Sequence, residues 1–380
     1  CSRALPFLVA ITTKAARKKR ARERRARKGR GKRMIGSMQS WPLLVWRLLD
    51  HAALNHGDRE IVTQTAHGVD RSSWRDVQRR AKRLAGALTG LGIGTGDRVA
   101  TLAWNTARHI ECWYGISGMG AVAHTINPRL FDDQIVFIGN HAEDRVLFFD
   151  PDLLPLVERL APRFESIERY VVLADRARMP ASARDLLCYE ELIAAESDDF
   201  AWADLDENAP AGLCYTSGTT GNPKGVLYSH RSNVLHTLGI LPVDGFALSS
   251  RSAMLPVVPM YHANAWGVPY AAAAVGAKLV LNGPHFDPET LHRLILTEQV
   301  THSAGVPTVW FSLLAHLEKT GGDLGRMERA LIGGSACPRS MIETLETRYG
   351  VEVVHAWGMT ELSPVGTLGA VCAAAESAPP

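Results

Sequence analysis

The residues best suited to chemistry gather in one glycine-rich stretch, YTSGTTGNPKGVLYSHRS, which spans residues 215–232. Glycine lets a backbone approach a ligand closely. Hydroxyls and exposed backbone N–H groups donate hydrogen bonds to anionic oxygens, and a lysine adds positive charge. The stretch therefore predicts a loop that holds the phosphates of a nucleotide. Its candidate ligands are Thr216, Ser217, Gly218, Thr219, Thr220, Gly221 and Lys224.

This loop differs from the ordinary phosphate loop, G-x-x-x-x-G-K-[ST], because Pro223 precedes Lys224 and Gly225 follows it. The alternative interpretation is a solvated linker of glycine, serine and threonine. Two apolar runs with the pattern of strands, 211–215 and 225–228, flank the loop. Because a linker is not normally followed at once by a buried strand, we favour a phosphate loop.

The segment YTSGTTGNPKG resembles the phosphate loop of the adenylate-forming enzymes, a superfamily that includes acyl-CoA synthetases, firefly luciferase and the adenylation domains of peptide synthetases. The resemblance implies that the loop binds ATP and that Thr216 and Lys224 take part in catalysis. It also implies that Thr216 contributes to a Mg²⁺ site.

A second candidate segment, VPMYHANAW, spans residues 258–266. On its own, His262 could orient a substrate carboxylate, but a lone histidine is more often structural, and Trp266 alone is more often a packing residue. The segment resembles the MFHVNAW-type segment of fatty acyl-CoA synthetases, from which Tyr261 and Ala263 depart conservatively. The resemblance implies that His262 lies near the reacting carboxylate and that Trp266 gates an acyl tunnel. It therefore favours an aliphatic acid over an amino acid as substrate.

Two more segments are expected near the substrate. GVPTVWFSLL, residues 305–314, has the pattern of a loop that leads into an apolar helix. ALIGGSA, residues 330–336, has the pattern of a strand ending in a tight turn, where a ligand can lie against the backbone. The resemblance implies that the first segment lines the acyl pocket, although core packing explains its apolar pattern equally well. It implies that the second segment lies along the edges of the adenine and of the acyl group. The matching residues are Val306, Pro307, Thr308, Gly333, Gly334, Ser335 and Ala336.

The segment HAWGMTELSP, residues 355–364, carries a carboxylate suited to a metal ion. Glu361 supplies a hard oxygen of the kind that Mg²⁺ prefers, Thr360 supplies a hydroxyl, and Trp357 supplies an aromatic face for adenine. Most relatives have tyrosine at the position of Trp357. The resemblance implies that Thr360 and Glu361 are catalytic and that Glu361 binds Mg²⁺. The implied nucleotide contacts are His355, Ala356, Trp357, Gly358, Met359 and Thr360.

The composition is that of a globular protein with two or more domains or subdomains, since the 380 residues are 46% hydrophobic and 21% charged. No uninterrupted apolar run approaches the length of a membrane span. The six cysteines, at positions 1, 112, 188, 214, 337 and 372, form no C-x-x-C pair, which argues against structural zinc and against a disulfide framework. We expect a cytoplasmic protein.

The excess positive charge lies in one extension. Residues 1–33 hold 14 Lys and Arg and one acid, so that the remaining 347 residues hold 28 basic and 38 acidic side chains, a net charge of −10. The extension could bind nucleic acid or anionic lipid, but no aromatic residues interleave the charges as a base-stacking surface requires. Because the composition changes abruptly at Met34, we favour a segment outside the folded protein.

Helical and strand patterns alternate after Met34, which predicts an α/β architecture with largely parallel sheets. Apolar residues at helical spacing predict a helix over 41–53. Ser73, with Asp76 three residues on, predicts the N-terminus of a second helix. The resemblance adds the arrangement: two α/β subdomains with parallel sheets flanked by helices, plus part of a β-barrel. Further strands are predicted at 98–104, 145–149 and 170–174.

The resemblance covers about residues 38–368. In the family the chain continues with an aspartate for the ribose hydroxyls, a hinge and a mobile C-terminal lid, whose lysine stabilises the adenylation transition state. The tail VCAAAESAPP is unlike this continuation, so we expect a chain truncated before the lid. The predicted domains are a basic extension over 1–33, an incomplete AMP-binding domain over 34–368 and an unrelated tail over 369–380.

The resulting hypothesis is a fatty-acid–CoA ligase that uses ATP, Mg²⁺ and coenzyme A to convert a medium- or long-chain fatty acid into acyl-AMP and then acyl-CoA. One alternative is a ligase for another acid, aryl or branched. Another is a non-catalytic remnant that binds nucleotide or acyl groups, suggested by the missing lid. Small molecules are the expected partners, with no specific nucleic acid. The resemblance leaves open a homodimer and a peripheral contact with a membrane.

Overall fold

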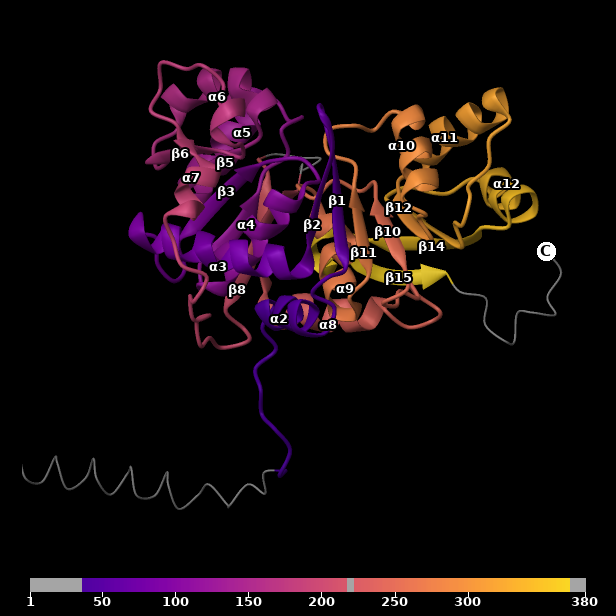
Figure 1. The fold of residues 1–380 in the computed structure, drawn as a ribbon, viewed down its shortest axis with the longest axis horizontal. Helices are drawn as coiled ribbons and strands as arrows, with labels where there is room; N and C mark the ends of the chain where they lie inside the picture. Colours follow the sequence, from indigo (N-terminus) through magenta and orange to yellow (C-terminus); the bar gives the residue numbers. More distant parts are fainter. Residues whose placement is uncertain (1–35, 217–221, 370–380) are drawn as a thin grey trace, which may run out of the picture. The chain divides into compact units, whose positions relative to one another are not determined.

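The computed structural model describes residues 36–216 and 222–369. The chain divides into two units, Cys1–Trp41 and Pro42–Pro380. Of the first unit, residues 36–41 are described, and they form no helix or strand. All elements below belong to the second unit and are labelled in Figure 1. The predictions about residues 1–33 concern a segment outside the described residues.

The larger of two sheets is parallel through its middle, and only its edge pairs are antiparallel. Its eight strands in the described ranges run, in spatial order, as β15 (Val365–Gly369), β14 (Glu352–Gly358), β13 (Arg329–Gly333), β12 (His302–Gly305), β10 (Ala253–Pro256), β11 (Lys278–Leu281), β1 (Glu60–Thr65) and β2 (Gly68–Ser73).

The smaller sheet is parallel except at the edge where β8 and β9 form a hairpin. The predicted strands at 98–104, 145–149 and 170–174 correspond to its β3, β5 and β6. The two-subdomain α/β prediction is therefore confirmed, while the part of a β-barrel stays a prediction. Its seven described strands are β7 (Leu187–Cys188), β6 (Arg169–Val172), β5 (Asp144–Phe149), β3 (Arg98–Leu102), β4 (Val122–Thr125), β8 (Pro210–Thr216) and β9 (Lys224–Ser229).

Helices cover both faces of both sheets (Figure 1). Helices α5 and α6 pack on one face of the smaller sheet, and α10, α11 and α12 pack on one face of the larger sheet. Helices α3 and α4 belong to the cores of both sheets and lie between them. The helices are α2 (Trp46–Asn55), α3 (Trp74–Gly90), α4 (Ala107–Gly118), α5 (Asp132–Ala142), α6 (Leu154–Leu160), α7 (Tyr189–Ala194), α8 (His230–Ile240), α9 (Val268–Val275), α10 (Pro288–Thr297), α11 (Pro307–Thr320) and α12 (Arg339–Tyr349).

Local sequence explains where the first two of these helices begin. The side chain of Ser73 accepts a hydrogen bond from the Asp76 N–H, and Asp76 accepts one from the Ser73 N–H, so the predicted cap of α3 is confirmed. The predicted helix over 41–53 is wrong at its start, because α2 begins at Trp46. Pro42 disfavours a helical conformation at the residue before it, and the chain turns before α2 begins.

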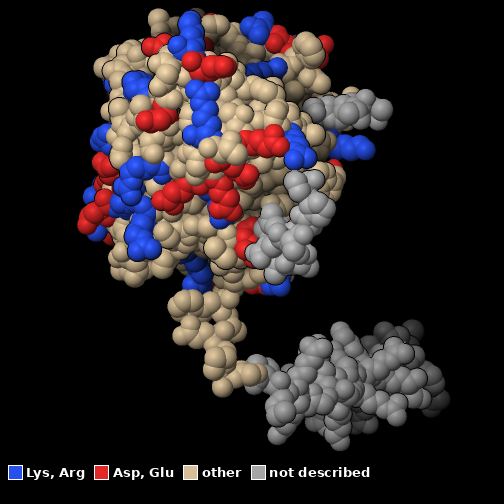
Figure 2. Space-filling model, turned by 90° about the vertical axis from the view of Figure 1, so that its right-hand side faces the viewer, with Lys and Arg blue, Asp and Glu red and all other residues tan. Residues whose placement is uncertain are grey.

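Charges of both signs share the surface. Figure 2 shows acidic and basic side chains interleaved over one face of the molecule. Arg145, for example, pairs with Asp97 at 2.9 Å and with Glu168 at 3.0 Å. Among the helices of the described ranges, none combines the length and the apolar character needed to span a bilayer.

Candidate active site

A cleft of about 150 Å³ opens where β13 and β14 end. The carboxyl ends of parallel strands are where ligands bind in α/β sheets. Three of the predicted segments, far apart in the sequence, meet in its wall. We call this hollow the site cleft, and the predicted residues that line it are His262, Trp266, Gly333, Gly334, Ala356, Trp357, Gly358, Met359 and Thr360.

The Trp266 indole lies against the two glycines that end β13. A Cβ atom added at Gly333 would lie 2.6 Å from the Ala356 carbonyl oxygen and 3.3 Å from the indole ring. Gly334 has a φ of +81°, and a Cβ there would lie 3.1 Å from a methyl group of Val306. Glycine is therefore required where the strand ends, because any side chain would displace the tryptophan or the neighbouring strand.

The segment that carries Trp266 has an unusual backbone. Residues Ala263 to Trp266 all have positive φ, between 45° and 56°, and Gly267 follows at 75°. The left-handed region costs a non-glycine residue about 1–2 kcal/mol, so the surrounding structure must hold this segment in place. Ala263–Gly267 is buried, and the Asn264 side-chain amide donates to the Asn233 side chain of α8 at 3.2 Å. Such strain is often retained at functional sites.

His262 stands at the start of this left-handed run. It is exposed at the cleft, while the groups packed around the imidazole partly desolvate it and lower its pKa. The ring is therefore neutral at physiological pH. A neutral imidazole can donate one hydrogen bond to a substrate carboxylate without carrying a charge of its own.

The opposite wall of the cleft is the turn after β14. The Met359 N–H donates to the Pro364 carbonyl at 3.0 Å and closes the turn. Trp357 leaves 57% of its surface exposed. Glu361 is exposed and forms no ion pair with another residue of the described ranges. The turn thus presents an aromatic face and a free carboxylate, as a nucleotide and its metal ion require.

The phosphate loop connects β8 to β9. Thr216, the last residue of β8, pairs with Lys224, the first residue of β9, so both known ends of the loop are adjacent. Lys224 is exposed and has no ion-pair partner within the described ranges. The predicted ligands between these two ends, Ser217, Gly218, Thr219, Thr220 and Gly221, lie outside the described residues.

One contact between the loop hairpin and the cleft was missed from the sequence. The hydroxyl of Tyr228 on β9 donates to the Thr360 carbonyl at 2.7 Å, across 132 positions of sequence. Strand β8 also contacts the Thr360–Leu362 turn. The only sequence signal was the spacing of Tyr228 from Lys224, because residues four apart share one face of a strand.

The remaining predicted residues lie beside the cleft rather than in its wall. Ser335 and Ala336 are exposed after β13, and the His355 ring lies 3.4 Å from the Ser335 carbonyl oxygen. Val306 precedes α11 and approaches Gly334. Pro307 is buried in the first turn of α11 and Thr308 is exposed. Neither Pro307 nor Thr308 is among the described residues that line the site cleft.

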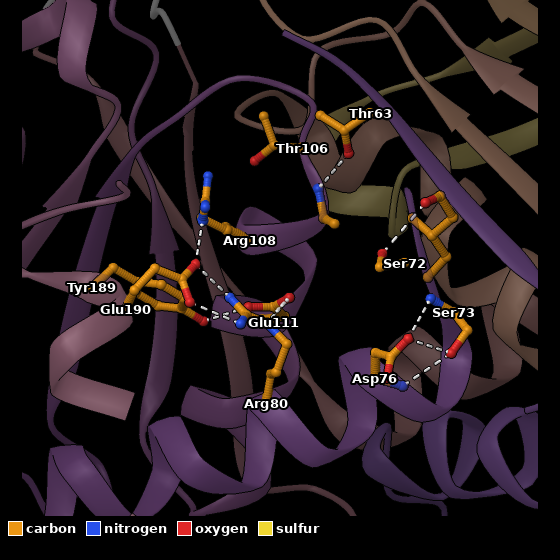
Figure 3. Close-up of polar contacts among 12 residues, drawn as sticks. Thr63, Ser72, Ser73, Asp76, Arg80, Thr106, Arg108, Glu111, Tyr189 and Glu190 are labelled. Atoms are coloured by element: carbon orange, nitrogen blue, oxygen red, sulfur yellow. Dashed lines mark hydrogen bonds and ion pairs between the residues drawn. The ribbon is translucent and has the colours of Figure 1, made fainter. Parts of the chain in front are cut away.

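A larger hollow, of about 860 Å³, lies elsewhere on the same side of the strands. It contains none of the predicted site residues among its described lining, and its walls come from β1, β2, α3, the start of α4, and the ends of β3, β5 and β6. We call it the charged cavity. Its polar core, shown in Figure 3, is Arg80, Arg108, Glu111, Tyr189 and Glu190.

The charges of this cavity pair with one another. Arg80 donates to Glu111 at 2.8 Å and makes two parallel bonds to Glu190, at 2.9 and 2.8 Å. Arg108 donates to Glu190 at 2.8 Å, and the Tyr189 hydroxyl donates to Glu111 at 2.6 Å. Burial raises the pKa of Glu111 despite Arg80. Burial also acts to raise the pKa of Glu190, but its hydrogen bonds and ion pairs with the two arginines outweigh it, so that pKa falls.

Asp150, in the wall of the same cavity, lacks such a partner. It is 7% exposed and accepts a hydrogen bond from the Trp104 N–H at 2.6 Å. No ion pair joins it to another described residue. Burial raises the pKa of Asp150 to about 7, against the effect of the Trp104 hydrogen bond. This carboxyl group therefore titrates near neutral pH.

The fold is similar to that of a solved acyl-CoA ligase. An anthranilate CoA ligase in complex with anthranoyl-AMP has a TM-score of 0.80 to this chain, covering 88% of it and 64% of the ligase chain, at 22% sequence identity. At this identity the likeness shows the fold alone. The fold and the cleft together define an α/β protein with a cleft at the ends of its parallel strands.

The family model described as AMP-binding enzyme matches residues 49–379, and the chain therefore belongs to the AMP-binding enzyme family. The predicted resemblance is confirmed. The medium-chain-fatty-acid–CoA ligase of Ectopseudomonas oleovorans is 51% identical over 320 residues, which cover 84% of this chain and 59% of the relative. The 3-methylmercaptopropionyl-CoA ligase of Ruegeria pomeroyi has the same identity and coverage. The long-chain-fatty-acid–CoA ligase of Thermus thermophilus is 50% identical over 317 residues, 83% of this chain and 57% of the relative. The chain thus spans about three fifths of the length of these relatives.

Proposed function

We propose that this chain carries the ATP and acyl sites of a fatty-acid–CoA ligase for medium- or long-chain acids. The observation that carries the proposal is the site cleft, in which His262, Trp266 and the turn at Thr360 meet beside the glycines of β13. The names of two relatives, a medium-chain and a long-chain fatty-acid–CoA ligase, support the substrate class.

The proposed reaction has two steps. A carboxylate oxygen of the acid attacks the α-phosphorus of ATP, which forms acyl-AMP and releases pyrophosphate. The thiol of coenzyme A then attacks the acyl carbon and releases AMP. Positioning and charge neutralisation supply most of the catalysis in such transfers. No protein nucleophile is required.

The proposed roles come from the resemblance, and the positions of the described side chains support them. Lys224 and the Thr216 hydroxyl hold phosphate oxygens, and Trp357 stacks on adenine. His262 orients the acid, and Trp266 closes the acyl path. Glu361, with Thr216, would hold Mg²⁺, and the exposed carboxylate without a cation partner in the described ranges fits that ion. When bound, Mg²⁺ neutralises charge on the phosphates.

The test is fatty-acid-dependent exchange of labelled pyrophosphate into ATP, which isolates the first step, in a version of the chain completed with the lid domain of a relative. We expect exchange with acids of medium or long chain, together with binding of Mg·ATP. Binding without exchange for any acid would leave a nucleotide-binding protein and would overturn the ligase.

A ligase for another carboxylic acid is the second candidate. The relative named 3-methylmercaptopropionyl-CoA ligase, whose named acyl group is short and carries sulfur, is as similar to this chain as the medium-chain ligase is. The same exchange assay, run with fatty, branched, aryl and sulfur-containing acids at one concentration, separates the two candidates. Faster exchange with a non-fatty acid would establish the second.

The proposal also includes a cytoplasmic location, which the cysteine pattern favours, the use of coenzyme A, which the resemblance implies, and the homodimer that the resemblance leaves open. Cell fractionation, sedimentation velocity and coenzyme-A-dependent release of AMP test these three properties separately.

A further inference from the structure

Two side chains hold the turn of the site cleft at its two ends. The Tyr228 hydroxyl donates to the Thr360 carbonyl at 2.7 Å, and the Val365 N–H donates to Nε2 of His236 at 3.1 Å. Tyr228 lies on β9 and His236 on α8, and α8 begins at the residue that directly follows β9. One continuous segment, Lys224–Ile240, which comprises β9 and α8, therefore forms hydrogen bonds with both ends of the turn.

The Tyr228 hydroxyl is committed to this bond. The side chain is 2% exposed, and its bond length is typical of an O–H···O hydrogen bond. Burial, with the nearby Cys214 thiol and Glu361 carboxylate, raises the pKa of Tyr228. The hydroxyl therefore keeps its proton and remains a donor over the whole physiological range.

His236 is likewise arranged as an acceptor. Its Nε2 accepts from a backbone N–H, so this nitrogen carries no proton. Burial lowers the pKa of His236 to about 4, so the ring stays neutral above that pH. A Cβ at Gly267, which has a φ of +75°, would lie 2.7 Å from Nδ1 of the ring. The glycine that ends the left-handed run thus makes room for this imidazole.

The same strand carries the lysine of the phosphate loop. Lys224 and Tyr228 are four residues apart on β9, so they share one face of the strand. The Tyr228 bond therefore sets where Thr360 and Glu361 stand relative to Lys224. Glu361 directly follows Thr360, whose carbonyl accepts this bond, so the carboxylate is one residue from the contact.

We propose that Tyr228 is a positioning residue that sets the spacing between the phosphate-loop lysine and the Thr360–Glu361 pair, with His236 securing the far end of the turn. Binding of nucleotide together with Mg²⁺ then depends on the Tyr228 hydroxyl, although this hydroxyl touches neither ligand. The inference rests on the proposed function, because it assigns Mg·ATP to this cleft.

The test compares Tyr228→Phe with the wild-type 380-residue chain by titration calorimetry. The variant keeps the ring and loses one hydrogen bond, so we expect the Kd for Mg·ATP to rise about fivefold. The half-saturating Mg²⁺ concentration should rise with it, while the Kd for ATP in EDTA should change less. A purely structural role would shift the melting temperature and leave the Mg²⁺ dependence unchanged.

Tyr189→Phe is the matched control, because it also removes one buried hydroxyl donor, 2.6 Å from Glu111 in the charged cavity. It should lower the melting temperature and leave Mg·ATP binding as in the wild type. His236→Ala should weaken Mg·ATP binding, and His236→Gln, which offers an amide oxygen as acceptor, should restore part of it.

Three results would overturn the inference. Wild-type affinity and Mg²⁺ dependence in Tyr228→Phe would overturn it alone and leave the proposed function standing. Equal weakening by Tyr228→Phe and Tyr189→Phe would show a general loss of stability. Absence of Mg·ATP binding by the wild-type chain would overturn the proposed function and this inference together.

Discussion

Two hollows lined by described residues lie at the carboxyl ends of parallel strands, the site cleft after β13 and β14 and the charged cavity after β3, β5 and β6. In the larger one, Arg80 is held by two carboxylates within the protein. On the turn beside the smaller one, Glu361 is exposed and has no ionic partner among the described residues, and the same is true of Lys224 on the adjoining hairpin.

Charges that pair within the protein stabilise the fold, whereas exposed charges without an internal partner remain available to a ligand. Internal partners satisfy the arginines and glutamates of the charged cavity, so their chief effect is to hold three helices together. The exposed carboxylate and lysine near the cleft do little for stability on their own and are available to a ligand. Size alone would favour the charged cavity as the active site, whereas we propose the site cleft. The pairing of charges is the better guide.

The largest effect is expected from Arg80→Met, which tests whether the charges of the cavity stabilise the fold. The substitution leaves Glu111, 2% exposed, without its cation. Removing one partner of a buried pair costs about 3–5 kcal/mol, and urea denaturation should show a loss of that size in the free energy of unfolding. Arg339→Met, which breaks the exposed pair with Glu343, should cost under about 1 kcal/mol. Equal losses would mean that the cavity charges are not structural.

The corresponding substitution on the turn beside the site cleft is Glu361→Gln, which tests whether this charge serves catalysis. We expect pyrophosphate exchange to fall by about 10²–10³-fold, as when one group that stabilises transition-state charge is removed. The free energy of unfolding should stay within about 0.5 kcal/mol of wild type, because the residue is exposed. Glu343→Gln, on the exposed face of α12, is the control for a surface charge. Retained exchange would remove Glu361 from the site.

Asp150→Asn tests a buried carboxyl group of the charged cavity that forms no ion pair with another described residue. Its pKa of about 7 in the folded chain lies above the usual value near 4 of an unfolded chain. Between those values the folded state binds more protons, so wild-type stability falls as pH rises from about 4 to 7. The variant should lose this slope and be more stable at pH 8 by about 1–3 kcal/mol. An unchanged slope would mean that Asp150 does not titrate there.

The smallest effect is expected from substitutions of Trp357, which test whether adenine stacks on this side chain. Trp357→Ala removes the aromatic face and should weaken Mg·ATP binding by about three- to tenfold. Trp357→Tyr keeps a stacking ring and should bind as the wild type does. Because Trp357 is 57% exposed, neither change should shift the melting temperature much. Equal affinity for all three proteins would place adenine elsewhere.

Features encoded by neighbouring residues could be predicted from the sequence. The cap of α3 depends on Ser73 and Asp76, three positions apart, and it is confirmed. The cleft residues were found because each group lies within a short motif of recognisable type. The start of α2 was misplaced because apolar spacing outweighed the effect of Pro42 on the residue before it.

Features built from distant residues could not be predicted. Arg80, Glu111 and Glu190 lie on α3, α4 and α7, and nothing local marks any of them as a partner of the others. The bond from Tyr228 to Thr360 spans 132 positions. Such contacts depend on how the two sheets and their helices pack, which periodicity does not specify.

The left-handed run at Ala263–Gly267 limits which side chains can evolve beside the proposed acyl path. Four consecutive non-glycine residues there have positive φ, a conformation that β-branched residues resist. A mutant library at these positions should therefore be depleted of valine, isoleucine and threonine, even where the side chain would fit a new substrate. Diversity should accumulate instead at facing positions with ordinary backbone angles, such as Val306, which has an extended conformation and approaches Gly334.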